Sequence, residues 1–295
     1  MIQTTSRLSA PKSVTDLQIP RRAGLEPAAF IRNYMLPRQP IVLTDATRDW
    51  DALTRWTPEF LQSRYGSMPV TIDGNEYPFD QFIDLVLGSS RSKPAPYLRN
   101  RSVHDLFPDL ASDIFPLPPH LKPNWLADNF FLPPLRKFMN RLTVVELFIG
   151  GVGTKFPVLH FDYAHTHAFL NQIYGEKAVT LFAPDQTPYL YCGEKNGVST
   201  VNDVEEPDLD RFPLFAKAVP IKLTLRPGET LFVPAGWWHT VLSLTPTITV
   251  STNTVNASNW SDFVHDITHT KRPVFRQLMA TYLLGIGAIK RRVSR

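Results

Sequence analysis

The stretch from Gly228 to Val241 is the part of the sequence that most restricts how this chain can fold. A β-type run, Thr230 to Val233, leads into a Pro-x-Gly turn at Pro234 to Gly236, and a second such run follows from His239 to Leu244. Short β-runs separated by tight glycine and proline turns are typical of sandwiches and jelly rolls. The sequence therefore predicts a mainly β fold in which His239 is held at a rigid corner between two strands.

His160 and Asp162 form the second informative feature. Side chains of an extended strand alternate between its two faces, so His160 and Asp162 point to one side while Phe161 points to the other. A second histidine from a distant strand would complete three ligands on one face of a metal ion, which is the arrangement of non-haem Fe(II) oxygenases. The setting of His239 at the start of a strand makes it the candidate. The predicted metal ligands are therefore His160, Asp162 and His239.

Several motifs then occur in the order found in one enzyme family. From Thr143 to about Trp260 the chain resembles the JmjC and cupin-like 2-oxoglutarate oxygenases. The spacing that ends at His239 is similar to the second cupin motif, although Ser243 stands where that motif has asparagine. A lone His-x-Asp occurs often by chance, whereas the ordered set is specific. The motifs that carry the resemblance are Gly150–Thr154, His160–Asp162, Gln172–Lys177, Gly228–Val241 and Ile248–Asn253.

The resemblance implies a double-stranded β-helix, a jelly roll of the cupin-like JmjC type, with helical additions at the N- and C-terminal ends. It also implies Fe(II) as the metal, 2-oxoglutarate as the co-substrate and O2 as the oxidant. Oxidative decarboxylation of 2-oxoglutarate would then be coupled to hydroxylation of a prime substrate, and hydroxylation of an N-methyl carbon would lead to demethylation. The sequence leaves open whether the prime substrate is a protein or peptide side chain, an RNA base or a small molecule.

Lys177 lies among apolar residues of a predicted strand. An unpaired buried ammonium is costly, so an inward Lys177 needs an anionic partner, which the distal carboxylate of 2-oxoglutarate would supply. By resemblance, Tyr97 reaches the same carboxylate, Ser251 and Asn253 line the co-substrate or metal pocket, and Thr166 aligns with a Ser/Thr of JmjC demethylases. A solvent-facing Lys177 and a Tyr97 that serves only packing remain the alternatives.

His165 and His167 offer a competing metal site, since the first cupin motif begins with His-x-His. That motif then needs a glutamate four or five residues later, where this chain has Asn171 and Gln172. We therefore favour His160 and Asp162, and we expect His165 and His167 to be pocket-wall or surface residues. Two further departures from the family concern the co-substrate pocket. Pro157 stands where many members have a threonine, and Leu170 stands where asparagine, tyrosine or phenylalanine is common.

The motifs divide the chain into four regions. Residues 1–20 are expected to be a flexible N-terminus, 21–140 a helix and strand region that packs on the core, 141–257 the jelly-roll core, and 258–295 C-terminal helices. In the second region we expect helices over 28–34, 58–65 and 79–87, a strand over 40–43, and an ordered irregular segment over 107–134, where frequent prolines prevent regular helix. A strand over 142–149 and a polar loop over 185–218 follow.

The composition is that of an ordinary globular protein, with 43% hydrophobic residues and a formal net charge of +4. The single cysteine, Cys192, excludes an internal disulfide framework, which fits the cytoplasm, and it is expected to be buried. The apolar run Leu283 to Ile289 is far shorter than the roughly 20 residues that a bilayer requires. We therefore expect a cytoplasmic protein with no membrane partner, and the modest charge does not favour a nucleic-acid partner.

The sequence leaves two questions open, the role of the C-terminal helices and the class of function. The C-terminal helices form a dimer interface in several relatives, whereas here their apolar residues would equally suit packing on the chain's own sheet. A metal-binding cupin of another class, either an enzyme that does not use 2-oxoglutarate or a non-catalytic binding module, is the alternative function. An open ligand triad together with an inward lysine argues against a binding module, and the Lys177 region argues against an enzyme that does not use 2-oxoglutarate.

Overall fold

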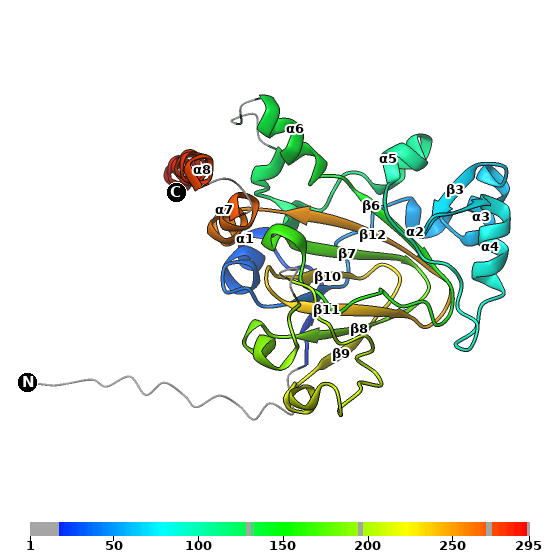
Figure 1. Ribbon diagram of the computed structural model, residues 1–295. Coiled ribbons are helices and arrows are strands. Elements are labelled where there is room, and N and C mark those ends of the chain that lie inside the picture. The colour runs from blue at the N-terminus through cyan, green and yellow to red at the C-terminus, as the bar shows by residue number, and fades with distance from the viewer. Residues whose placement is uncertain (1–17, 128–130, 132, 194–196, 270–272, 294–295) are drawn as a thin grey trace, which may run out of the picture.

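The computed structural model describes residues 18–127, 131, 133–193, 197–269 and 273–293. Two facing β-sheets form the centre of the molecule, as Figure 1 shows. The larger sheet has the strand order β1-β2-β10-β7-β12-β6-β5, and the smaller sheet has the order β11-β8-β9. The strands of the larger sheet are β1 (Arg21–Arg22), β2 (Ile41–Leu43), β10 (Thr230–Val233), β7 (His167–Tyr174), β12 (Thr247–Thr254), β6 (Glu146–Gly150) and β5 (Leu98–Ser102).

The smaller sheet consists of β11 (Trp238–Ser243), β8 (Lys177–Phe182) and β9 (Ile221–Leu225). Its outer edge is extended by the irregular segment that leads to the predicted metal ligands. Lys155 bridges to Leu242, and His160 bridges to His239, both in antiparallel fashion. The chain thus crosses between the two sheets in the manner of a double-stranded β-helix, and the expected jelly-roll fold is confirmed.

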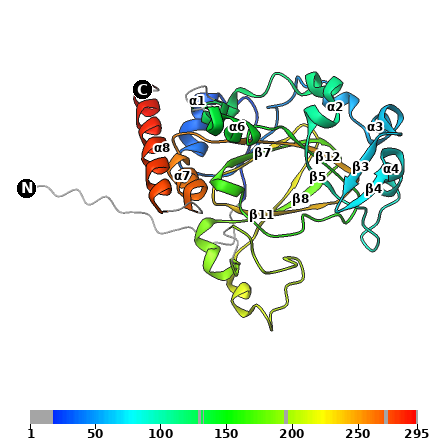
Figure 2. The same cartoon turned by 45° about the horizontal axis from the view of Figure 1, so that its top comes forward.

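Helices cover the two ends of the sheets, and Figures 1 and 2 agree on their placement. The helices α3 and α4 lie at one end with a small β-hairpin, while α7 and α8 lie at the other end. The bounds are α1 (Pro27–Phe30), a π-helical turn (Ile31–Met35), α2 (Ala52–Arg55), α3 (Pro58–Tyr65), β3 (Pro69–Ile72), β4 (Asn75–Pro78), α4 (Phe79–Leu87), α5 (Val103–Leu106), α6 (Pro133–Arg141), α7 (Trp260–His269) and α8 (Pro273–Val293).

Local sequence explains where α3 begins and which face of α4 is buried. The hydroxyl of Thr57 accepts the backbone N–H of Phe60, and proline at the first position of α3 lacks a donor that would otherwise be left free. In α4 the buried residues recur at helical spacing, so one face of this helix packs on the core. These are Phe79, Phe82, Ile83 and Val86.

A separate cluster around Trp260 fixes the C-terminal helices. The indole N–H of Trp260 donates to the carbonyl of Leu283 at 2.9 Å, and its ring lies against Gly287 of α8. A Cβ added at Gly287 would lie 2.4 Å from the Trp260 ring, so only glycine allows this close approach. The burial of Trp260 therefore depends on a residue without a side chain.

The structure confirms the expected helix boundaries of α3 and α4 and changes other expectations. The strand expected over 142–149 begins only at Glu146, because α6 continues to Arg141. The proline-rich segment over 107–134 contains short 3-10 turns, with α6 starting at Pro133. Cys192 is exposed, so its expected burial is wrong. The expected flexibility of residues 1–20 falls almost entirely outside the described residues. No helix in the described ranges is both long and apolar enough to span a membrane.

Candidate metal centre

His160, Asp162 and His239 form a compact group of potential ligands. One ligand atom from each residue lies within 4.8 Å of the other two, and no fourth residue joins this group within the described part of the chain. The backbones of His160 and His239 pair directly, with N–H to carbonyl distances of 3.1 and 2.6 Å. The Pro-x-Gly turn places His239, since Gly236 has a left-handed φ of 82° and Trp237 donates to the Pro234 carbonyl. The structure thus brings together the three predicted ligands.

The hydrogen bonds of the two imidazoles determine which nitrogen can bind a metal. Nδ1 of His160 lies 3.3 Å from the Val158 carbonyl, and Nδ1 of His239 lies 3.2 Å from the Trp237 carbonyl. A carbonyl only accepts, so each Nδ1 carries the proton and each Nε2 keeps its lone pair. The backbone therefore presets both rings as Nε2 ligands.

Burial sets the protonation of the same groups. It lowers the pKa of His160 to about 4, with His239 adding repulsion, and it lowers the pKa of His239 to about 4. Burial also raises the pKa of Asp162, which His160 partly opposes. Neutral imidazoles are the form that binds a metal. Two imidazole nitrogens and one carboxylate oxygen in this compact group suit a divalent ion, so the donor set fits the implied Fe(II).

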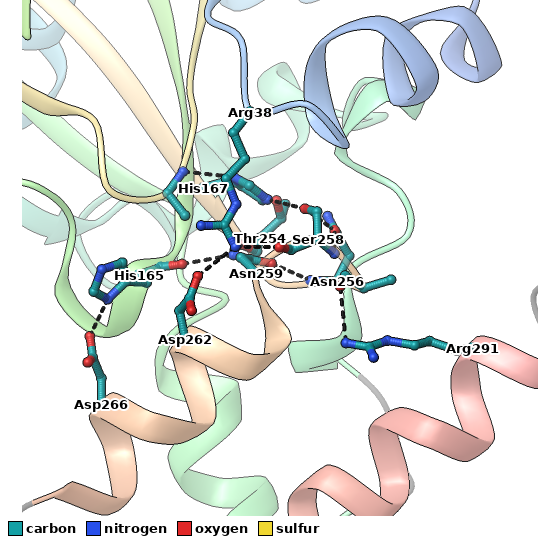
Figure 3. Close-up of polar contacts among 12 residues, drawn as sticks. Arg38, His165, His167, Thr254, Asn256, Ser258, Asn259, Asp262, Asp266 and Arg291 are labelled. Carbon is teal, nitrogen blue, oxygen red and sulfur yellow. Dashed lines mark hydrogen bonds and ion pairs between the residues drawn. The ribbon is translucent and has the colours of Figure 1, made fainter. Parts of the chain in front are cut away.

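A polar network from α7 supports the turn that follows Asp162. Ala164 and His165 both have left-handed φ angles, 56° and 49°, which are unusual for residues with a side chain. Figure 3 shows that this turn is tied to α7: Asp266 lies 2.5 Å from Nδ1 of His165, and the side-chain amide of Asn259 donates to the His165 carbonyl at 2.9 Å. Contacts from α7 and from Asn259 just before it thus hold the strained backbone that follows Asp162.

Lys177 lines an inner chamber of about 70 Å³ that also borders the three ligands. The strand register pairs Lys177 with Ser243, four residues along β11 from His239, so the ammonium and the ligands come from different levels of the sheet. Its ammonium donates to the hydroxyls of Thr249 at 2.7 Å and Tyr97 at 3.3 Å. No ion pair of Lys177 is found among the described residues. Burial lowers the pKa of Lys177 to about 7 and raises that of Tyr97. The predicted inward orientation of Lys177 is therefore what the structure shows, with Tyr97 beside it.

The other predicted co-substrate residues fall into two places. Ser251 and Asn253 line the inner chamber from β12. The side-chain oxygen of Asn253 is buried and has no hydrogen-bond partner, so an acceptor is left available there. Thr166 instead lines a neighbouring outer chamber, where its hydroxyl donates to the Tyr163 carbonyl at 3.3 Å. Thr166 is therefore not brought together with Lys177, and its role as a co-substrate residue stays a prediction.

His167 does not fit the expectation of a pocket-wall or surface residue. It is fully buried, its Nδ1 accepts the Ala235 N–H at 2.9 Å, and its Nε2 donates to the Ser258 hydroxyl at 2.8 Å (Figure 3). Burial lowers the pKa of His167 to about 3, with Arg38 adding repulsion. His167 is thus a neutral core residue that joins the sheet to the start of α7, and the prediction is wrong because a partner exists for each ring nitrogen.

Three residues near the metal group were missed by sequence reasoning. Thr249 shares a strand face with Ser251 and Asn253, so the alternation of β12 could have revealed it. Phe156 stacks on His160 with a centroid distance of 4.4 Å and an interplanar angle of 20°, a contact that no motif signals. Glu146 lines both chambers, and its signal was a lone carboxylate within an apolar strand.

Fold and site together define a cupin-type metal-binding protein. The cupin-like domain family matches residues 27–258, and the chain belongs to this family. Its curated relatives include the lysine-specific demethylase JMJ21 of Arabidopsis thaliana, which is 28% identical over 82% of this chain and 26% of that protein. The 2-oxoglutarate and iron-dependent oxygenase JMJD4 of Mus musculus is 29% identical over 86% of this chain and 64% of that protein.

A third relative is the tRNA wybutosine-synthesizing protein 5 of Gallus gallus, which is 28% identical over 77% of this chain and 74% of that protein. The chain covers less than two thirds of the length of the plant and mouse relatives. The comparisons confirm the resemblance drawn from the motifs. Fe(II) and 2-oxoglutarate, the expected cofactors, agree with the name of the mouse relative and with the His/Asp/His group.

Proposed function

We propose that this chain is an Fe(II)- and 2-oxoglutarate-dependent dioxygenase that hydroxylates a prime substrate. The observation that carries the proposal is one chamber that borders both the metal ligands and the buried ammonium of Lys177. A molecule with a chelating keto acid group and a second carboxylate could bind the metal through the first group and pair with Lys177 through the second. 2-Oxoglutarate has this form.

Each residue of the chamber then has a defined task. His160, Asp162 and His239 would hold the iron, which when bound with 2-oxoglutarate supplies the activation of O2. Lys177 and the hydroxyl of Tyr97 would bind the distal carboxylate, because each can donate a hydrogen bond to it. The hydroxyl of Thr249 donates to Gln172 and accepts from Lys177, so it would orient the ammonium. Phe156, stacked on His160, restricts the movement of that ring and keeps water from one side of it.

The type of oxidation is the finer part of the proposal. Hydroxylation of an unactivated carbon and demethylation through an N-methyl carbon use the same donor set, and the relatives' names include a demethylase, an oxygenase and a tRNA-modifying protein. We propose hydroxylation, because a hydroxylated carbon is the product common to both routes. Demethylation requires in addition a substrate nitrogen that bears the methyl group.

We also propose that the chain pairs with a second copy through α8. This helix exposes Leu278, Leu284 and Ile289 by 67%, 46% and 58%, and apolar side chains on one helix support packing against a partner. Of the apolar residues of this helix that the sequence singles out, Val274, Leu278, Leu283, Ile286 and Ile289, the side chain of Val274 lies outside the described residues. Light scattering of the native protein should give the mass of a dimer, and Leu284→Asp should give a monomer.

Turnover without a prime substrate tests the enzymatic proposal. Purified protein with Fe(II), ascorbate and 2-oxoglutarate should release succinate above a control without protein. The release should be lost in His239→Ala and suppressed by N-oxalylglycine, whereas Glu76→Gln on the distant β4 should leave it unchanged. If succinate is absent and 2-oxoglutarate also fails to bind the Fe(II) protein, the chain is a cupin of another class.

A further inference from the structure

Two of the three metal-group residues, His160 and Asp162, line a second chamber beside the inner one. The outer chamber, of about 300 Å³, is lined by residues that include Tyr163, Thr166 and Arg141 and shares His160 and Asp162 with the inner one. If the inner chamber takes 2-oxoglutarate, as the proposed function requires, the outer chamber is where a prime substrate can approach the same metal. The residues that line the outer chamber therefore select the substrate.

Glu146 is the acidic residue at the junction of the two chambers that is not part of the metal group. It lies on β6 between Ser251 of β12 and Ser102 of β5. Alternation along β6 sends Leu147 and Ile149 into the hydrophobic core, so Glu146 and Phe148 face the chamber. Two flanking strands thus hold the Glu146 backbone in place and fix the direction of its side chain.

The carboxylate of Glu146 has no partner among the described residues. The side chain of Glu146 makes no hydrogen bond or ion pair within them, and Arg141, which lines the same chamber, is not within the ion-pair distance of 4.0 Å. Burial, with a smaller contribution from repulsion by Asp162, raises the pKa of Glu146 to about 7. A partly buried carboxylate is costly without a donor, so this position favours a group that brings a positive charge or N–H donors.

A second acceptor points into the same space. The side-chain oxygen of Asn253 is buried without a donor, and Asn253 lines the outer as well as the inner chamber. Charge balance in the loaded site agrees with this. The positive charges of Fe(II) and Lys177 would be offset by Asp162 and doubly charged 2-oxoglutarate. Glu146 then keeps its negative charge without a direct partner, because Arg141 lines the outer chamber but does not pair with it.

We propose that Glu146 determines substrate specificity by binding a protonated amine or guanidinium of the prime substrate in the outer chamber. This inference rests on the proposed function, since it assigns the inner chamber to 2-oxoglutarate. Glu146 does not hold the metal, and it selects substrates by pairing their positive charge next to the metal. Neutral and acidic groups of the same size are excluded because they leave the carboxylate unpaired or repel it.

Binding to the loaded full-length protein tests this assignment without turnover. Protein loaded with Mn(II) and N-oxalylglycine is mixed with N-acetyl-arginine N-methylamide, or with the citrulline derivative, which is its neutral isostere. Paramagnetic broadening of the probe's proton resonances reports binding near the metal, and Zn(II)-loaded protein provides the diamagnetic control. n-Butylguanidine carries the same cation without a peptide backbone and distinguishes a small-molecule source from a peptide source.

The arginine probe should bind about tenfold more tightly than the citrulline probe, as expected for a charge-assisted hydrogen bond. The difference should disappear in Glu146→Gln, persist in part in Glu146→Asp and remain intact in Glu76→Gln. Equal binding of the two probes to the wild type, no binding of either, or an unchanged preference in Glu146→Gln would overturn the proposal. Mn(II) that fails to bind, seen by electron paramagnetic resonance, would overturn the proposed function itself and this inference with it.

Discussion

Replacing Lys177 by methionine should stabilise the protein when metal and 2-oxoglutarate are absent. The ammonium is buried, donates to the hydroxyls of Tyr97 and Thr249 and lies 5.6 Å from the centroid of the Tyr97 ring, with no carboxylate partner among the described residues. Its burial lowers the pKa of Lys177 from 10.5 to about 7. At about 1.4 kcal/mol for each pH unit, the charged form costs the folded state about 5 kcal/mol below pH 7. Methionine has a similar length, but it leaves the two hydroxyls without a donor. We therefore expect a net gain of about 2–4 kcal/mol.

The pH dependence makes this prediction specific. The folded protein releases the Lys177 proton at a lower pH than the unfolded chain, so between pH 7 and 10.5 the unfolded chain binds more protons. The wild type therefore gains stability relative to Lys177→Met as the pH rises through this window. The advantage of the variant should be complete below pH 7 and should shrink by about 1.4 kcal/mol for each pH unit above it.

Urea unfolding in EDTA, followed by tryptophan fluorescence at pH 6.5 and pH 9, measures both effects. Lys93→Met, at an exposed lysine outside the chamber, is the matched control and should change stability little at either pH. A variant at Lys177 that is less stable than the wild type at pH 6.5, or a difference that does not vary with pH, would refute the view that the chamber holds an unpaired ammonium.

Three further outcomes follow from the same structure. Metal affinity should remain high at pH 6 and fall as the pH approaches 4, because burial lowers the pKa values of His160 and His239 to about 4. A calorimetric titration in which Mn(II) binding is lost near pH 6.5 would argue against the burial of the two histidines. Asp266→Ala should weaken Mn(II) binding about tenfold by releasing the turn after Asp162, whereas His265→Ala at an exposed position should not. Gly287→Ala should destabilise the protein by about 1–3 kcal/mol, because the new Cβ would meet Trp260. Gly285→Ala, which has open space around it, should stabilise the protein by up to about 1 kcal/mol. Equal shifts of the melting temperature for the two variants would contradict the packing of α8.

The sequence predicted the metal group because its geometry depends on short-range rules. Strand alternation places His160 and Asp162 on one side, and a Pro-x-Gly turn fixes where His239 re-enters. The direction of Lys177 was predictable for the same reason, since its strand neighbours are apolar. Local periodicity was thus enough wherever a functional residue lies on a regular strand or next to a tight turn.

Other features depend on contacts between distant segments, which a single sequence does not reveal. Thr166 lines its chamber from the end of a turn that α7 holds in place. The contact that holds the turn joins His165 to Asp266, which is 101 residues further along the chain. The burial of His167 depends on Ser258, and the role of Glu146 depends on two flanking strands. These residues acquire their environment only after the sheets have assembled.

In the proposed complex the metal group and Lys177 hold opposite ends of one 2-oxoglutarate molecule. The most direct measurement is a calorimetric titration of 2-oxoglutarate into Mn(II)-loaded protein, compared with metal-free protein, with His239→Ala and with Lys177→Met. We expect binding that is lost without metal and in His239→Ala, and weakened about ten- to hundredfold in Lys177→Met while Mn(II) affinity stays unchanged. Binding of 2-oxoglutarate that is independent of the metal, or equal in Lys177→Met and the wild type, would contradict it.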